Sequence, residues 1–155
     1  MRPTLVSGFV ALAFVTGFAA SRWTAPAEAQ SGPPPLRPQI VNLLALTDDE
    51  IGKPAPAPNT DLRSKTLAVT EHGTLAVQTG NVIKHFHADA NEFQLILAGS
   101  GSFWLDDKEV QVKPGDLVVI PKGTHHAGSK ASEGRFKALA IKMPPQRPDD
   151  VHPVN

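Results

Sequence analysis

The segment from His85 to Glu92 constrains the fold of this chain most, because it places two imidazoles and a carboxylate close together in the sequence. In a helix, side chains two residues apart point about 200° away from each other, whereas in a strand they share one face. His85 and His87 can therefore hold one metal ion only from a strand. Strand-forming residues flank this segment, and Ala88 to Asn91 is typical of a short turn. We expect a hairpin on which Glu92 faces back toward the two histidines.

A second segment, from Gly115 to His126, has the order turn, apolar strand, turn and histidine. It can bring another imidazole to the hairpin from a different strand. His125 and His126 cannot both point inward, because neighbouring residues of a strand face opposite sides. By the same alternation, Gln94 shares the inward face of Glu92 and is a candidate pocket residue.

These two segments resemble the two conserved motifs of the cupin superfamily. The first motif is Gly, five residues, His-x-His, three or four residues, Glu, six residues and Gly. The second is Gly, five residues, Pro-x-Gly, two residues, His, three residues and Asn. The matching residues are Gly80, His85, His87, Glu92 and Gly99 for the first motif, and Gly115, Pro121, Gly123 and His126 for the second. One residue is missing after Gly80, and Lys130 stands where the family often has Asn.

The resemblance covers residues 62–143 and implies an all-β fold, the double-stranded β-helix or jelly-roll barrel. It assigns the inward position to His126 rather than His125. The implied metal ligands are His85, His87, Glu92 and His126. Three imidazoles and one carboxylate suit Mn, Fe, Co, Ni, Zn or Cu better than Mg or Ca, so we expect a divalent transition metal as cofactor. Among exported single-domain cupins, the set is similar to that of germins and oxalate-metabolising enzymes.

The pattern from Ser64 onward is one of short strands separated by turn signals, which is typical of a β-sandwich or barrel. Gly99-Ser100-Gly101 is one of these turn signals. The expected strands lie near residues 64–70, 74–79, 82–87, 92–98, 102–105, 108–113, 116–120, 125–129 and 135–142.

The first 29 residues have the pattern of a signal peptide. A charged start at Arg2 precedes an apolar run from Leu5 to Ala20, and Ala27-Glu28-Ala29 offers a cleavage site. We therefore expect a periplasmic or secreted protein. The alternative is an uncleaved anchor, and only in that case do we expect contact with a membrane.

The remaining sequence divides into three parts. Residues 30–60 are expected to form a Pro-rich linker with a strand at Ile40–Leu46, residues 61–143 the cupin domain, and residues 144–155 a Pro-rich tail in which His152 is disordered. Thr47 is predicted to cap a short helical turn. The stiff segment Lys53–Pro58 either crosses the surface or covers the mouth of the barrel. From the family resemblance, the strand at Ile40–Leu46 is expected to pair with a second copy in a homodimer.

Composition narrows the function. Lys plus Arg and Asp plus Glu number 15 each, so no net field attracts nucleic acid, and we expect no nucleic-acid partner. Cys and Tyr are absent, which removes thiolate and phenol chemistry. We expect a metal-dependent oxidoreductase or lyase acting on a small oxygenated metabolite, with Glu92 and Gln94 as the catalytic residues; among cupin relatives, oxidation, decarboxylation, isomerisation and lyase reactions all occur. The alternative is a non-catalytic periplasmic module that binds metal or a small ligand.

Overall fold

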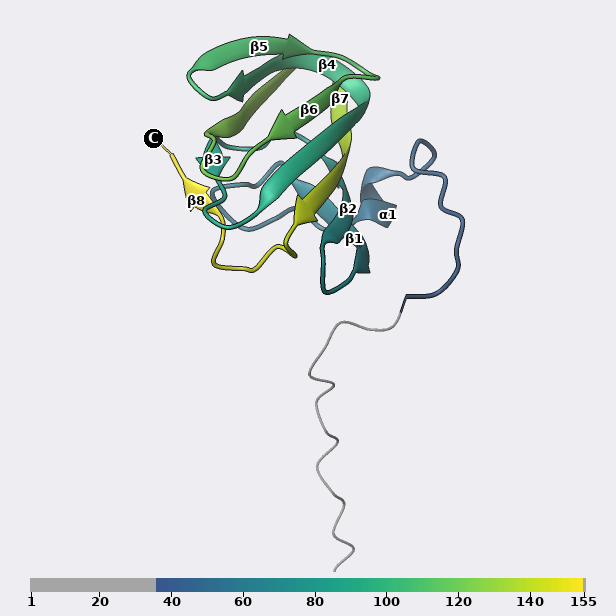
Figure 1. The fold of residues 1–155 in the computed structure, drawn as a ribbon. Coiled ribbons are helices and arrows are strands. Elements are labelled where there is room, and N and C mark those ends of the chain that lie inside the picture. Colours follow the sequence, from purple (N-terminus) through teal and green to yellow (C-terminus); the bar gives the residue numbers. More distant parts are fainter. Residues whose placement is uncertain (1–35, 155) are drawn as a thin grey trace, which may run out of the picture. The chain divides into compact units, whose positions relative to one another are not determined.

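The computed structural model of this protein describes residues 36–154, so the expected signal peptide lies outside the described residues. Antiparallel strands dominate the fold (Figure 1). The elements are one short helix, α1 (Asp48–Ile51), and the strands β1 (Arg63–Val69), β2 (Thr74–Thr79), β3 (His85–Phe86), β4 (Asn91–Leu105), β5 (Lys108–Val112), β6 (Leu117–Ile120), β7 (His126–Met143) and β8 (His152–Pro153).

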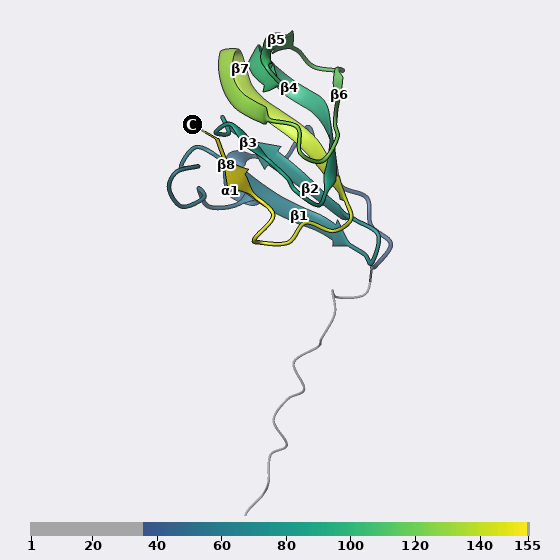
Figure 2. The same cartoon turned by 60° about the vertical axis from the view of Figure 1, so that its left-hand side comes forward.

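The long strands β4 and β7 hold the barrel together. They pair with each other along most of their length, and β4 also pairs with β5 and β6. The second half of β7 pairs with β2, while His126 at its start pairs with β3. In Figures 1 and 2, β4, β5 and β6 lie on one side and β1 and β2 on the other, with β7 running between them. The sheet thus curls on itself, which confirms the predicted jelly-roll fold.

The strand count differs from the prediction because two pairs of expected strands are continuous. Residues 92–98 and 102–105 both belong to β4, and the expected strands 125–129 and 135–142 are joined in β7, which begins at His126. Gly99-Ser100-Gly101 is therefore not a turn. The register between β4 and β7 is irregular here, and Gly99 has a φ of 76° and packs against the backbone of Arg135. A bend that only glycine tolerates, together with a close backbone approach, has the same sequence signature as a turn.

In the N-terminal part of the described chain, the predicted helix cap is confirmed and the predicted strand is wrong. Thr47 caps α1, and its hydroxyl and the Glu50 carboxylate form a reciprocal capping box. The expected strand at Ile40–Leu46 is not formed; this segment contains a turn closed by a hydrogen bond from Ala45 N to Asn42 O. Within residues 36–154, no helix is long and apolar enough to cross a membrane.

The expectation that His152 is disordered is wrong. His152 and Pro153 form β8, which pairs with β3 through Phe86 and His85. The ring of His152 stacks on Phe86 with 4.8 Å between centroids. Proline-rich composition did not prevent pairing, because a two-residue strand at the sheet edge needs few backbone donors.

Burial alternates along β4 as the strand period requires. Glu92, Gln94 and Ile96 are buried, while Phe93 and Leu95 on the opposite face are only partly buried. Inward side chains of β4, β5, β6 and β7 build an apolar core. Its buried members are Ile96, Phe103, Val112, Val118, Ile120, Ala127, Phe136 and Ala138. Along the inward face of β4, the polar Glu92 and Gln94 thus come first and the apolar Ile96 and Phe103 follow.

Candidate metal centre

The structure brings His85, His87, Glu92 and His126 together. All four side chains are buried, and one potential ligand atom from each lies within 4.8 Å of the others. Strand pairing explains the convergence, since His85 on β3 is the direct partner of His126 on β7. Glu92 enters from β4, after the turn that follows His87.

Each imidazole of the cluster has its Nδ1 engaged by a backbone carbonyl. Nδ1 of His85 contacts the oxygen of Ile83 at 2.9 Å, and Nδ1 of His126 contacts the oxygen of Thr124 at 2.9 Å. Nδ1 of His87 makes a short contact with the backbone oxygen of Asp150. A carbonyl only accepts, so Nδ1 carries the hydrogen in all three rings. A neutral ring then presents its Nε2 lone pair for ligation.

The carboxylate of Glu92 is shared between two kinds of contact. Oε2 lies 3.0 Å from Nε2 of His87 and 3.1 Å from Nε2 of His126. Oε1 accepts a hydrogen bond of 2.9 Å from Nε2 of Gln94 and lies 3.3 Å from Nζ of Lys142. Lone pairs of two rings and one oxygen therefore meet at a point where either an additional proton or a cation must lie. This donor set fits a divalent transition-metal ion, whose identity it leaves open.

Electrostatics favour the ionisation states that a metal site needs. Burial, followed by the nearby His126 ring, lowers the pKa of His85 to about 4, so this ring is neutral at pH 7. Burial alone would raise the pKa of Glu92, but Lys142 and the contacts with His126 and His87 outweigh it and hold this pKa well below its usual range. Glu92 is thus a carboxylate when the rings are neutral.

The face assignment of the two adjacent histidines agrees with the expectation from the family motif. His126 is fully buried and lies in the cluster, whereas His125 is partly exposed and packs near Phe86, with 5.5 Å between ring centroids. Gln94, expected to line the pocket, is buried and contacts Glu92 rather than standing alone. Whether these residues bind metal or act in catalysis remains a prediction.

Two residues at the centre were missed by the sequence analysis. Lys142 is 5% exposed and lies opposite Glu92 in the β4–β7 ladder. Its signal was available, because Phe136, Ala138 and Ala140 alternate along the predicted strand and Lys142 continues that face. Asp150 had no such signal, since it lies in an irregular Pro-rich segment.

Asp150 supports the loop that carries His87. Its carboxylate accepts hydrogen bonds from the backbone N–H groups of Ala88, Asp89 and Ala90, at 2.7, 2.9 and 3.1 Å. Its backbone oxygen orients the ring of His87. Burial would raise the pKa of Asp150, but these three N–H groups outweigh it and lower the pKa below its ordinary value. One residue of the tail thus fixes both the turn and the tautomer of a ring in the cluster.

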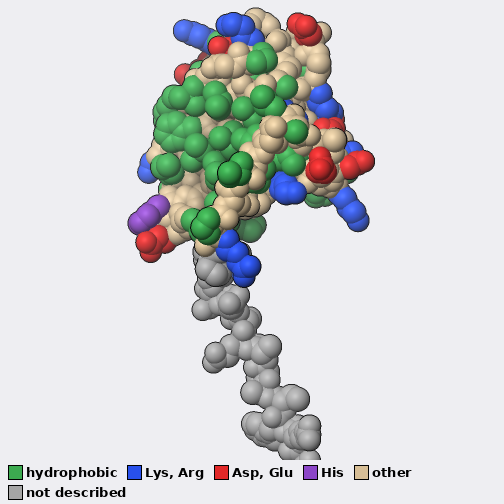
Figure 3. Space-filling model, turned by 90° about the vertical axis from the view of Figure 1, so that its right-hand side faces the viewer, with side chains coloured by type: hydrophobic (Ala, Val, Ile, Leu, Met, Phe, Trp, Pro, Cys, Tyr) green, Lys and Arg blue, Asp and Glu red, His purple; other side chains and the backbone are tan. Residues whose placement is uncertain are grey.

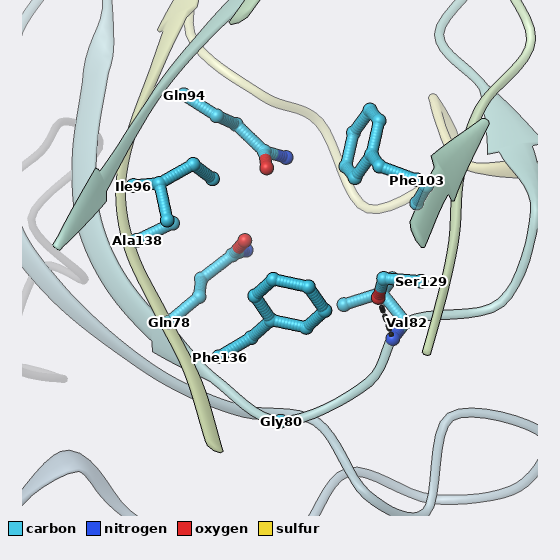
Figure 4. A pocket seen from close by; sticks show the side chains of 10 residues that line it. Gln78, Gly80, Val82, Gln94, Ile96, Phe103, Ser129, Phe136 and Ala138 are labelled. Carbon is cyan, nitrogen blue, oxygen red and sulfur yellow. Dashed lines mark hydrogen bonds between the residues drawn. The ribbon is translucent and has the colours of Figure 1, made fainter. Parts of the chain in front are cut away.

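Two cavities open beside the cluster. The first, of about 100 Å³, is lined by three cluster residues, with Lys142, the amides of Asn59, Gln78, Gln94 and Gln146, and the apolar Leu62, Val82 and Val151. Asn59 and Leu62 follow the stiff Lys53–Pro58 segment, so the chain just after that loop borders the site. The second cavity, of about 30 Å³, shares Gln78, Val82 and Gln94 with the first (Figure 4).

The sequence of the β-barrel matches a known protein family. Residues 72–142 match the family model for the cupin domain. This chain contains a cupin domain. The cupin is 37% identical over 82 residues to an acireductone dioxygenase of Ixodes scapularis, covering 46% of this chain and 44% of that protein. It is 33% identical over 82 residues to acireductone dioxygenase 4 of Arabidopsis thaliana, covering 46% and 43%. The chain thus spans less than half the length of these relatives.

Solved structures show the same fold at low identity. A conserved protein with a double-stranded β-helix domain from Klebsiella pneumoniae superposes with a TM-score of 0.54 at 16% identity, covering 64% of this chain and 88% of that one. KdgF from Halomonas superposes with a TM-score of 0.51 at 20% identity, covering 61% and 87%. These likenesses agree with the jelly-roll assignment made from strand pairing.

Proposed function

We propose that this cupin is an exported, metal-dependent enzyme that acts on a small oxygenated metabolite. The observation that carries the proposal is the set of three imidazoles whose Nδ1 atoms are all held by backbone carbonyls. Their Nε2 lone pairs and the Glu92 carboxylate converge beside a cavity of about 100 Å³. Preorganised ligands next to a small polar pocket are what metal-assisted chemistry on a small molecule requires.

Oxidation is the reaction class that the relatives favour, because the curated proteins matched are named acireductone dioxygenases. Acireductone is therefore the first substrate to test, with decarboxylation, isomerisation and lyase reactions as the other possible classes. A bound transition metal would supply Lewis acidity and, if redox-active, electron transfer.

The protein's own side chains would hold the metal ion and orient the groups around it. His85, His87 and His126 are held rigidly by backbone carbonyls, so they keep a fixed ligand geometry. Gln94 fixes the carboxylate of Glu92 by donating to Oε1, which leaves Oε2 directed at the histidines. We assign Glu92 as the residue that tunes the charge of the ion, and Gln94 as a residue that can also contact substrate.

A binding module is the second candidate, and a specific observation favours it. Apart from the cluster residues, Lys142 is the one titratable side chain among the described residues that line the cavity beside the cluster. Amide side chains cannot carry protons in general acid–base catalysis. If Lys142 does not act as a general acid or base, the same site would bind a metal ion or a small ligand without catalysing a reaction.

Metal content is the first test. Protein purified from its native host is expected to contain about one transition-metal ion per chain, as measured by elemental analysis. His87→Ala and His126→Ala should each weaken metal affinity at least about tenfold, because each removes a ligand. His125→Ala is the matched control and should leave affinity unchanged. Equal losses for His125→Ala and His126→Ala would refute the ligand assignment.

Turnover is the second test and separates enzyme from binder. Wild-type protein carrying its native metal should be screened with acireductone, small dicarboxylates, keto acids and thiols, with dioxygen consumption and product formation measured. A reaction that disappears in His126→Ala supports the enzyme. Retained metal with no reaction across the screen favours the binding module.

Export is also proposed, on the sequence pattern of residues 1–29. Intact-mass analysis of protein from the periplasm or medium of the native host is expected to show a mature chain that begins near Gln30. Recovery of the full-length chain from the cytosol would contradict export.

Pairing into a homodimer is proposed on the exposed hydrophobic residues of the N-terminal arm, Leu36, Ile40 and Leu44. Figure 3 shows hydrophobic side chains gathered on one face, and Leu117 and Val119 of β6 are further exposed hydrophobic residues. Covering such surfaces is a common reason for association. Light scattering should give a dimer for the mature chain and a monomer after deletion of residues 30–46; the same mass for both would rule out this arm as the contact.

A further inference from the structure

Lys142 is placed unusually for a lysine. It lies on the inner face of β7, is 5% exposed, and borders the same cavity as His85, His87 and Glu92. Its Nζ lies 3.3 Å from Oε1 of Glu92, which also accepts from Gln94. An ammonium has three N–H donors, and lysine is rarely buried without partners for them. One shared carboxylate oxygen therefore leaves donor capacity directed at the cavity.

The net charge of the metal-loaded site also favours the binding of an anion. Among the described residues, the charged side chains that are buried are Glu92, Lys142 and Asp150, which together carry a net charge of minus one. A divalent ion in the cluster changes this net charge to plus one. The ion would also interact with the carboxylate of Glu92. That carboxylate then neutralises less of the positive charge of Lys142. A buried site with excess positive charge is stabilised by an anionic ligand.

We propose that Lys142 determines specificity by selecting a small monoanion with two neighbouring oxygens, such as a carboxylate beside a keto or enol oxygen. This inference rests on the proposed metal site. One oxygen of such a ligand would reach the metal while the other accepts a hydrogen bond from Lys142. The cavity of about 100 Å³ suits a small ligand.

The second cavity limits the rest of the ligand. In Figure 4 the amides of Gln78 and Gln94 and the rings of Phe103 and Phe136 point toward the same space. Its volume of about 30 Å³ accepts a methyl-sized group beyond the two amides. Apolar walls there disfavour a second charged group at that end. A short 2-keto or 2-hydroxy acid with a small apolar end meets both conditions.

The test compares pyruvate with pyruvamide, which has a similar shape but no charge. Metal content and metal affinity of wild type, Lys142→Met and Lys142→Arg are measured first. Calorimetric titration of each metal-loaded protein then gives the affinity for both probes. Wild type should bind pyruvate about tenfold to a hundredfold more tightly than pyruvamide, which is the range for a hydrogen bond to a charged group. Lys142→Met should reduce this preference, with the remainder due to the attraction of the ion for the anion, and Lys142→Arg should retain more of it than Lys142→Met.

Lys130→Met is the matched control, because Lys130 is an exposed lysine on the same strand. It should keep the wild-type preference. Normal metal binding with an unchanged preference for pyruvate in Lys142→Met, or with equal affinities for the two probes in wild type, would overturn the role of Lys142 and leave the metal site standing. Failure of wild type to bind metal would overturn the proposed function and this inference with it. Circular dichroism and Lys142→Arg separate lost selectivity from lost folding.

Discussion

Glu92 uses its two carboxylate oxygens for different contacts. Oε2 meets His87 and His126, while Oε1 is held by Gln94 and Lys142. The side chain is 1% exposed, so its orientation is set by these partners rather than by solvent. One oxygen of the Glu92 carboxylate is thus held in place by its neighbours, and the other is available as a metal ligand.

Glu92→Gln tests that carboxylate. The amide is neutral, so it raises the effective charge of the ion and weakens metal retention together. At saturating metal, turnover should fall roughly tenfold or more with the fold intact, if the reaction depends on the charge of the ion. Asp89→Asn is the control, since Asp89 is exposed and pairs with Arg147. Equal turnover of wild type and Glu92→Gln would exclude a catalytic role for Glu92.

His85 predicts a pH dependence of the metal-free protein. Its pKa is about 4 when folded, against an ordinary value of 6.5. Between these values the unfolded chain takes up a proton and the folded chain does not, so stability is full above pH 6.5 and decreases as the pH falls toward 4. For this group the free energy of unfolding should fall by about 1.4 kcal/mol per pH unit.

Urea unfolding in the presence of a chelator measures this slope. His85→Gln should flatten it relative to wild type, because the titrating ring is gone. His72→Gln should not, since that side chain is 86% exposed. Parallel slopes for wild type and His85→Gln would show that His85 is not the group responsible.

At the scale of elements, the segment after β7 returns to the barrel and holds the loop between β3 and β4. Its contacts are the β3–β8 pairing, the ion pair of Arg147 with Asp89, and the hydrogen bonds to Asp150. The exposed ion pair contributes little, whereas the buried carboxylate accepts three amides. This segment is thus a part of the candidate metal centre.

Asp150→Ala should destabilise the protein by about 2–4 kcal/mol, because it removes a buried carboxylate that accepts from three backbone N–H groups, one of them in a buried hydrogen bond. Metal affinity measured on the folded protein should also fall, since the position of His87 depends on this segment. Arg147→Ala is the matched control and should cost at most about 1 kcal/mol. Chemical denaturation measures both variants. Similar stability losses for the two would show that Asp150 is not the main contact.

At the scale of the whole domain, the ligand set ties together parts that are far apart in sequence. Glu92 lies on β4 and His126 on β7, and these strands also close the barrel. A metal ion that binds only the folded state stabilises it by mass action, about 2.7 kcal/mol when the free metal concentration is 100 times the Kd.

Removing the metal should therefore lower the melting temperature of the wild type. Differential scanning fluorimetry with and without a chelator measures the change, and His126→Ala should show little of it. A chelator effect that is equally large in His126→Ala would indicate that the ion binds elsewhere.

The sequence by itself determined the strand character, the inward faces and the site residues that lie within motifs. Alternation decided that Glu92 and Gln94 share a face, and the spacing of His85 and His87 predicted extended backbone at His85, where β3 (His85–Phe86) begins. These are local properties with a period of two residues, so they can be read without knowing the partner strands.

Tertiary structure alone decided what lies between these elements. The bend at Gly99 depends on the approach of Arg135, and the role of Lys142 depends on its position opposite Glu92. Asp150 reaches the turn after His87 across 60 or more residues of sequence. A carboxylate satisfied by three backbone amides leaves no periodic pattern in the sequence, because its partners are N–H groups that every residue except proline possesses.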